Sequence, residues 1–138
     1  MKYMLDTNIC FFVLRNKDNQ AENVIKNIKA HKAEDICISS ITYAELMHGV
    51  EKNVNPSKKR LGLMLFLSNI SVLDFDQKAA EEYGKIRVVL EKNRNIIGPM
   101  DILLIAAHGK SLGMTIVTNN TREFERVEGL KVEDWSQE

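Results

Sequence analysis

Short apolar runs punctuate this chain, and five of them have the composition of β-strands. The runs at residues 3–5, 36–39 and 114–118 are bounded by polar or turn residues, as strands inside a buried sheet are. The runs at 70–75 and 130–135 alternate more between apolar and polar positions. These last two therefore predict strands that lie on the outside of the sheet.

The segments between the runs carry apolar residues at spacings of three and four, which predicts helices. We expect helices over residues 41–50, 58–67 and 76–92. Pro99 opens a further helix at a favoured first-turn position, and Gly113 closes it. Strands that alternate with helices in this way predict an α/β fold, in which an α/β/α sandwich surrounds a central, mainly parallel sheet.

Composition limits how the chain can be organised and what it can bind. Its 138 residues predict a single domain over residues 1–138, with enough length to bury a core. The formal net charge is zero, although 28% of the residues are charged. This balance excludes a protein that binds nucleic acid through bulk positive charge, so a polyanion must be held by a local basic patch or a bound cation.

Both cysteines, Cys10 and Cys37, lie inside apolar runs. A free thiol in such a run behaves as a small hydrophobic group, so we expect both to be buried and reduced, and the protein to be cytoplasmic. The longest apolar run, residues 9–14, is too short to cross a membrane. The first six residues include an acid where a signal peptide has its apolar centre, so we expect no targeting segment.

Two aspartates stand where a charge is costly. Asp6 follows the first predicted strand and precedes the apolar run 9–14, and taken alone it is explained equally well as a helix N-cap. Asp101 opens a helix that is apolar on every side and must therefore be buried. The helix dipole stabilises such a carboxylate by about 0.3–1 kcal/mol, which is less than the cost of leaving it unpaired. A cation or a set of hydrogen bonds is expected nearby.

A third acid, Glu45, lies about one helical turn after the second predicted strand, a position where Glu is usually an ordinary surface residue. A parallel sheet would gather Asp6, Glu45 and Asp101 at the edge formed by the carboxyl ends of its strands. Acids gathered there repel one another unless a divalent cation is present, and oxygen ligands select Mg²⁺ or Mn²⁺. Asn120 and Glu123 follow the strand predicted before them and offer further oxygen ligands, although paired asparagines at a strand end are usually turn residues.

Other polar residues have simpler interpretations. His108 lies seven residues after Asp101, but a hydrogen-bonded histidine of the core or surface is expected more often than a ligand. The basic groups at 58–60, Arg87 and 92–94 are candidates for contacts with a phosphate backbone. Taken one at a time, each is better explained as part of a solvated helix face.

Four sequence blocks, in this order, resemble PIN-domain ribonucleases, and most closely the VapC toxins of bacterial type II toxin–antitoxin modules. They are MLDTN at 4–8, SxITxxELxxG at 39–49, IGPMDILLIAA at 97–107 and VTNNTREF at 117–124. Each block alone is weak, whereas the ordered set is specific and spans nearly the whole chain. The resemblance implies a PIN-like fold and metal-dependent endonucleolytic cleavage of RNA.

The resemblance also assigns site residues. Asp6 and Asp101 match the two aspartates that bind magnesium, for which Mn²⁺ is a possible substitute, and Glu45 matches the third acidic position. Many members carry a fourth acid in the last block, where this chain has Asn120. Either Glu123 supplies the missing charge or the site works with a weaker fourth ligand. The number of metal ions is therefore left open.

Partners follow from the same resemblance. It implies a homodimer and a cognate antitoxin that blocks the acidic groove. Operator DNA would be contacted only through that antitoxin, and no membrane would be involved. The substrate is expected to be structured RNA such as tRNA, although no residue specifies which RNA or which bond is cut. Attack by water would leave a 5′-phosphate and a 3′-hydroxyl.

Two other functions are compatible with the residues. A non-catalytic PIN-like module that binds a partner protein is favoured by the departure at Asn120. An α/β domain that is phosphorylated on Asp6, as in haloacid-dehalogenase-like phosphatases, is disfavoured because those enzymes carry a second aspartate two positions later and this chain has Asn8.

Overall fold

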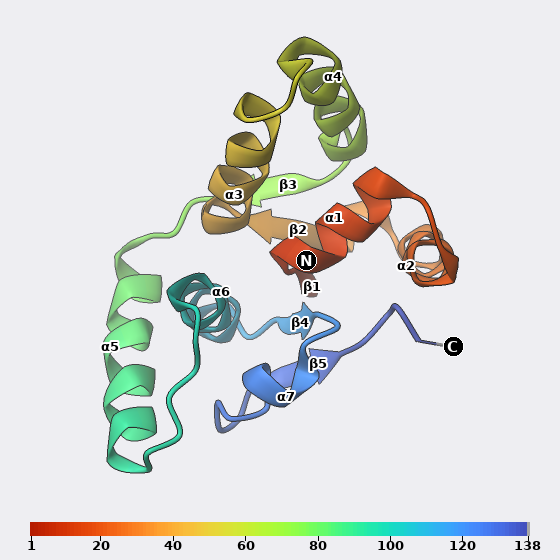
Figure 1. The fold of residues 1–138 in the computed structure, drawn as a ribbon. Coiled ribbons are helices and arrows are strands. Elements are labelled where there is room, and N and C mark those ends of the chain that lie inside the picture. The colour runs from red at the N-terminus through yellow and green to blue at the C-terminus, as the bar shows by residue number, and fades with distance from the viewer. Residues whose placement is uncertain (138) are drawn as a thin grey trace.

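Five parallel strands form the central sheet of the computed structural model, which describes residues 1–137 (Figure 1). They are β1 (Tyr3–Leu5), β2 (Ile36–Ser39), β3 (Ser71–Leu73), β4 (Thr115–Val117) and β5 (Lys131–Glu133). Their order is β3-β2-β1-β4-β5, and each neighbouring pair is parallel. The predicted α/β fold is thus confirmed, and the two strands expected on the outside, β3 and β5, are the edges.

Helices connect the strands, and four of them were predicted, over residues 41–50, 58–67 and 76–92 and from Pro99 onward. They are α1 (Thr7–Arg15), α2 (Asn19–Ala30), α3 (Ser40–Glu51), α4 (Pro56–Leu67), α5 (Gln77–Lys92), α6 (Met100–Ser111) and the short α7 (Thr121–Phe124), with a 3₁₀ turn at Ala33–Asp35. Helix α6 begins one residue later than predicted, because Pro99 is its N-cap rather than its first residue. Gly113, which adopts a φ of 66°, follows its end as expected.

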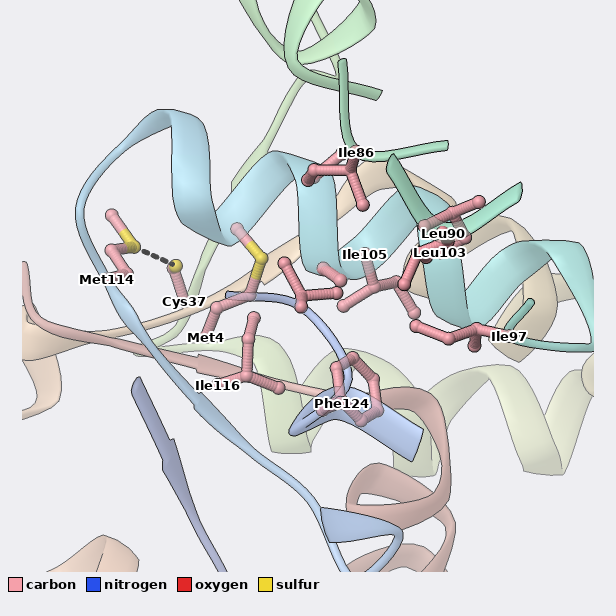
Figure 2. Packing of buried hydrophobic residues seen from close by; sticks show 13 residues of the cluster. Met4, Cys37, Ile86, Leu90, Ile97, Leu103, Ile105, Met114, Ile116 and Phe124 are labelled. Carbon is pink, nitrogen blue, oxygen red and sulfur yellow. Dashed lines mark hydrogen bonds between the residues drawn. The ribbon is translucent and has the colours of Figure 1, made fainter. Parts of the chain in front are cut away.

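Alternate residues of the inner strands face opposite layers of helices. Met4 and Ile116 pack into a cluster with α5 and α6 (Figure 2), whereas Leu5 and Val117 pack into a second cluster with α1 to α4. All four side chains are fully buried. Because a strand directs successive side chains to opposite faces, an inner sheet covered on both sides needs apolar residues at every position. The two clusters establish the α/β/α sandwich.

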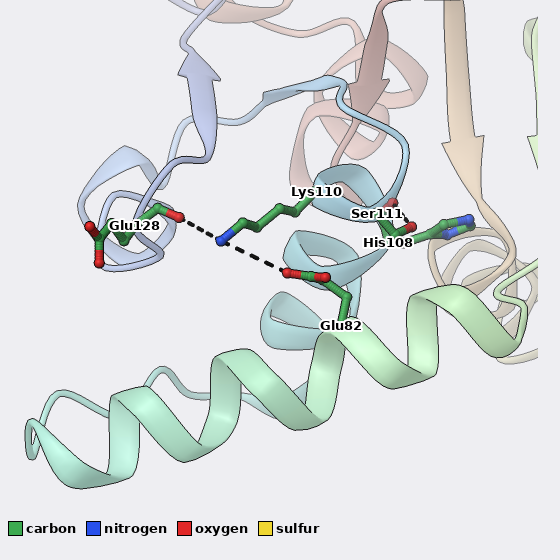
Figure 3. Close-up of polar contacts among 5 residues, drawn as sticks. All are labelled: Glu82, His108, Lys110, Ser111 and Glu128. Atoms are coloured by element: carbon green, nitrogen blue, oxygen red, sulfur yellow. Dashed lines mark hydrogen bonds and ion pairs between the residues drawn. The ribbon is translucent and has the colours of Figure 1, made fainter.

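Helix α6 lies close against the sheet and is buried along most of its length. Gly109 permits this approach, because a Cβ atom at that position would collide with the side chain of Ile116 on β4. Lys110 fixes the end of the helix: its Nζ donates to the carbonyl of Glu128 at 2.7 Å and lies 3.8 Å from the Glu82 carboxylate of α5 (Figure 3). The prediction of a buried helix carrying Asp101 is confirmed.

Cys10 and Cys37 are free and buried, as predicted. His108 is a core residue, only 2% exposed, and its Nδ1 lies 2.8 Å from the hydroxyl oxygen of Ser39 at the end of β2. This histidine therefore joins α6 to the β2–α3 junction and is not exposed for metal binding. Among the helices of residues 1–137, none has the length and apolar character needed to span a membrane.

Candidate active site

Asp6 lies directly after β1, in the middle of the sheet, and is 4% exposed. One oxygen, Oδ1, accepts a hydrogen bond from the backbone N–H of Ile9 at 2.9 Å, so the residue caps α1. The other, Oδ2, accepts from the hydroxyl of Thr118 at 2.5 Å. Asp6 is therefore the N-cap of α1, as the first interpretation predicted. It also lies just past the end of a central strand, where the second interpretation placed it.

Burial raises the pKa of Asp6 from 3.8 to about 6, because a charged carboxylate loses its hydration there. The hydrogen bonds from Thr118 and Ile9 lower the pKa, while the nearby charges of Asp101 and Asp134 raise it further. Within residues 1–137, no Lys, Arg or His forms an ion pair with Asp6. A desolvated carboxylate near two other acids is a place where a cation would be stabilising.

Asp101 occupies the first turn of α6 and is partly buried. Its helix begins without a side-chain cap, since the N-cap is Pro99. The structure places Asp101 near enough to Asp6 for its charge to affect that carboxylate. The charge of one predicted magnesium ligand thus acts on the other, although the two residues come from elements far apart in the sequence.

Glu45 lies on α3 with its side chain exposed. One turn earlier, the buried hydroxyl of Thr42 accepts a hydrogen bond from Thr7 at 3.2 Å, which ties α3 to α1. Across the described residues, no three His, Cys, Asp or Glu side chains form a group that could hold a metal ion. The structure places the charge of Asp101 near Asp6, and it does not show Glu45 joining them.

The last two predicted site residues follow β4. Asn120 directs its backbone N–H to the hydroxyl oxygen of Thr118 at 2.9 Å, so it supports the residue that binds Asp6. Glu123, on α7, has one oxygen 3.1 Å from Nη1 of Arg126, which donates its hydrogen bond to the carbonyl of Ile96 instead. That Glu123 oxygen is buried and has no hydrogen-bond partner. The charge of Glu123 is therefore compensated by Arg126.

Two residues of this region escaped the sequence analysis as individual candidates. Thr118 is fully buried and connects Asn120 to Asp6 through its hydroxyl. Asp134, just after β5, contributes a third negative charge near Asp6. Thr118 is the last residue of the predicted strand 114–118, and Asp134 is the last residue but one of the predicted strand 130–135. Their positions near strand ends were the available signal for both.

Two of the basic residues proposed for RNA contacts take part in surface interactions. Arg60 pairs with Glu51 at 3.6 Å, and Arg87 pairs with Glu91 at 3.5 Å. The guanidinium of Arg87 also donates to the hydroxyl of Tyr83 at 2.9 Å. These contacts fit the interpretation of Arg60 and Arg87 as parts of solvated helix faces.

The profile of the PIN domain matches residues 3–130. A match over so much of the chain shows that this protein belongs to the PIN-domain family, as the four sequence blocks indicated.

Within that family the similarity is to VapC ribonucleases. The chain is 46% identical over 136 residues to the tRNA(fMet)-specific endonuclease VapC of Shigella flexneri, with 99% of each chain covered. It is 42% identical to the Salmonella typhimurium protein of the same name, with 98% of each covered. Among solved structures, the DNA-bound VapBC of Salmonella typhimurium matches with a TM-score of 0.89 at 41% identity, covering 98% of both chains.

Proposed function

We propose that the chain is the toxin of a type II toxin–antitoxin module and an endoribonuclease that requires Mg²⁺, or Mn²⁺ in its place, held by Asp6 and Asp101. The observation that carries the proposal is the buried Asp6 carboxylate, which lies near Asp101 without a paired cation in the described chain. Similarity over the full length to VapC ribonucleases supports the reaction class. PIN-domain nucleases as a class depend on divalent metal ions.

The residues fit such an ion because every side chain predicted to bind it offers oxygen, the ligand that hard cations prefer. A bound divalent cation would neutralise charge that develops on the phosphodiester and would favour ionisation of the attacking water. The chain itself orients the site: the hydroxyl of Thr118 donates to Oδ2 of Asp6 and the N–H of Ile9 holds Oδ1. Glu45 is exposed and supplies an additional carboxylate, while Asn120 supports Thr118 through its N–H.

The overall reaction is a hydrolysis. Water adds its oxygen to phosphorus, the bond between phosphorus and the 3′ oxygen breaks, and the proton ends on that oxygen. The products carry a 5′-phosphate and a 3′-hydroxyl. Solvent exclusion around Asp6 strengthens the electrostatic interactions that stabilise this transition state.

The relatives support a substrate and partners for this chain. The similarity to two tRNA(fMet)-specific endonucleases supports initiator tRNA as the substrate of this chain. The matching VapBC structures support a cognate antitoxin, with operator DNA reached through it. We extend the proposal to a homodimer and to the cytoplasm, where the two buried free cysteines would stay reduced.

Purified protein freed of antitoxin tests the proposal. Incubated with initiator tRNA in Mg²⁺, it should produce discrete fragments with 5′-phosphate ends, and EDTA should stop the cleavage. The Asp101→Asn variant should be folded and inactive. Unchanged cleavage in EDTA, or full activity of that variant, would contradict the proposal.

A further inference from the structure

A cavity of the molecule includes in its lining Asp134, whose charge acts on Asp6. This cavity of about 550 Å³ is formed between α2 and the segment that follows β5. Its lining consists of polar residues and one aromatic residue: Asn23, Lys26, Asn27, Glu133, Asp134, Trp135 and Gln137. In parallel α/β sheets, ligands bind outside the carboxyl ends of the strands. Two residues of the lining stand at such an end, because Glu133 is the last residue of β5 and Asp134 follows it.

Hydrogen bonds within the protein hold the walls of the cavity in place. The side-chain amide of Asn23 donates to the carbonyl of Ser136 at 3.0 Å, and that of Asn27 donates to the carbonyl of Asn23 at 2.9 Å. The indole N–H of Trp135 donates to the carboxylate of Glu133 at 3.0 Å, and its ring stacks on His31 with centroids 4.6 Å apart. The cavity is preformed, so little free energy would be needed to order its walls when a ligand binds.

Backbone and charge connect the cavity to Asp6. Glu133 in the cavity wall accepts a hydrogen bond, through its carbonyl, from the backbone N–H of Thr118 at 2.9 Å. The hydroxyl of Thr118 is in turn bonded to the Asp6 carboxylate. Asp134, also in the wall, is close enough for its charge to act on Asp6. The wall of the cavity is therefore linked to Asp6 through Thr118 and through the charge of Asp134.

The lining offers one cation together with several hydrogen-bond acceptors, two of them the carboxylates of Glu133 and Asp134. Lys26 supplies a cation. The side-chain amide nitrogens of Asn23 and Asn27 donate hydrogen bonds to backbone carbonyls of the protein, which leaves the amide oxygens as acceptors. Trp135 offers little ring surface, since it is 3% exposed. A ribonucleotide unit matches this set through its phosphate, its 2′-hydroxyl and the donors on its base edge.

We propose that this cavity binds a nucleotide of the RNA substrate next to the phosphodiester that is cut at Asp6. The inference rests on the proposed ribonuclease function and adds a place for the RNA that flanks the cut. Lys26 contacts the phosphate, and the acceptors of the wall contact the sugar and base. A cationic segment of the antitoxin is the competing occupant, because the wall also contains Glu133 and Asp134.

Two lysines of α2 provide a matched test. Lys26 lines the cavity, whereas Lys29 is exposed on the same helix and does not line it. Binding of fluorescent initiator tRNA is measured in EDTA by anisotropy at several salt concentrations, and kcat and KM are measured in Mg²⁺. Lys26→Ala should raise Kd about fivefold and lower the salt slope by about one. It should raise KM with kcat unchanged, while Lys29→Ala should stay within about twofold of the parent in Kd.

A second variant, Gln137→Trp, fills the cavity without removing a charge and should also raise Kd. Equal effects of the two lysine variants, or no effect of Lys26→Ala and Gln137→Trp, would overturn the proposal. So would a Lys26→Ala protein that binds tRNA normally but binds purified antitoxin more weakly. A parent protein that cannot cleave RNA refutes the ribonuclease function itself, whereas a cleaving parent with an insensitive cavity refutes only the subsite.

Discussion

Asp6 and Glu45 are both acids predicted for one site, yet they differ in burial and in hydrogen bonding. Asp6 is buried at the centre of the sheet, and both of its oxygens are hydrogen-bonded. Glu45 is exposed on α3, with no ion pair or side-chain hydrogen bond among the described residues. The difference indicates that the charged form of Asp6 lowers the free energy of unfolding while the fold holds it in a fixed place. The exposed Glu45 has little effect on that free energy.

The largest effect should come from removing the charge of Asp6. Asp6→Asn keeps the size of the side chain and an oxygen for capping α1, so the protein should fold. RNA cleavage should fall by at least about a hundredfold, because the proposed site loses the fixed charge that would hold the cation. The measurement is the cleavage rate of initiator tRNA in saturating Mg²⁺. Activity within a few fold of the parent would show that burial of Asp6 serves folding only.

The pH dependence of unfolding in EDTA measures what the buried charge costs. The folded protein binds the Asp6 proton more tightly than the unfolded chain, because the pKa rises from 3.8 to about 6. Stability contributed by this residue should therefore fall as pH rises from about 4 to about 6, by about 3 kcal/mol, and stay level above that. Asp6→Asn should lose this dependence and be the more stable protein at pH 7. Urea unfolding of both proteins from pH 4 to 8 checks the prediction, and parallel curves would contradict it.

A smaller effect is expected when Asp6 loses the hydroxyl that orients it. Thr118→Val keeps the shape of this fully buried side chain but leaves Asp6 Oδ2 and the N–H of Asn120 without their partner. Stability at pH 7 should fall by about 1–3 kcal/mol, the cost of unsatisfied buried polar groups. Thr118→Ser keeps the hydroxyl and is the control. A valine variant as stable as the serine variant in chemical denaturation would show that the hydrogen bond contributes little.

The smallest effect on stability should be at Glu45. Glu45→Gln should change the free energy of unfolding by less than about 0.5 kcal/mol, since the side chain is exposed. Cleavage should nonetheless fall by about tenfold, because the variant lacks a carboxylate that we propose for the catalytic site. Denaturation and cleavage assays on one preparation separate the two quantities. Activity at the parental level would remove Glu45 from the proposed site.

The sequence predicted the strands well because buried parallel strands have an unmistakable composition. Residues 36–39 are apolar or small and are buried at every position, and the more alternating runs became the sheet edges. Helix α2 was not predicted, although Asp18 caps it and Val24 and Ile28 lie four residues apart on it. Only one face of α2 packs against the rest of the protein, so most of its residues are polar. The few apolar residues do not form a clear helical period in the sequence.

The site was predicted only as far as single strands and helices reveal it. Asp6 and Asp101 were identified because each is a charge in an apolar context, and the fold brings them into electrostatic contact. Thr118, Arg126 and the cavity beside Trp135 depend on contacts between residues distant in sequence. No local pattern encodes such contacts, so they became visible only in the folded chain.

The most direct test of the account is whether a divalent cation relieves the cost of the buried charge. Thermal unfolding of the antitoxin-free protein at pH 7 is followed with EDTA and with increasing Mg²⁺ or Mn²⁺. At a cation concentration a hundred times its Kd, the parent should gain about 2.7 kcal/mol, and Asp6→Asn should gain almost nothing. Equal stabilisation of both proteins, or none in the parent, would contradict a cation site built on Asp6.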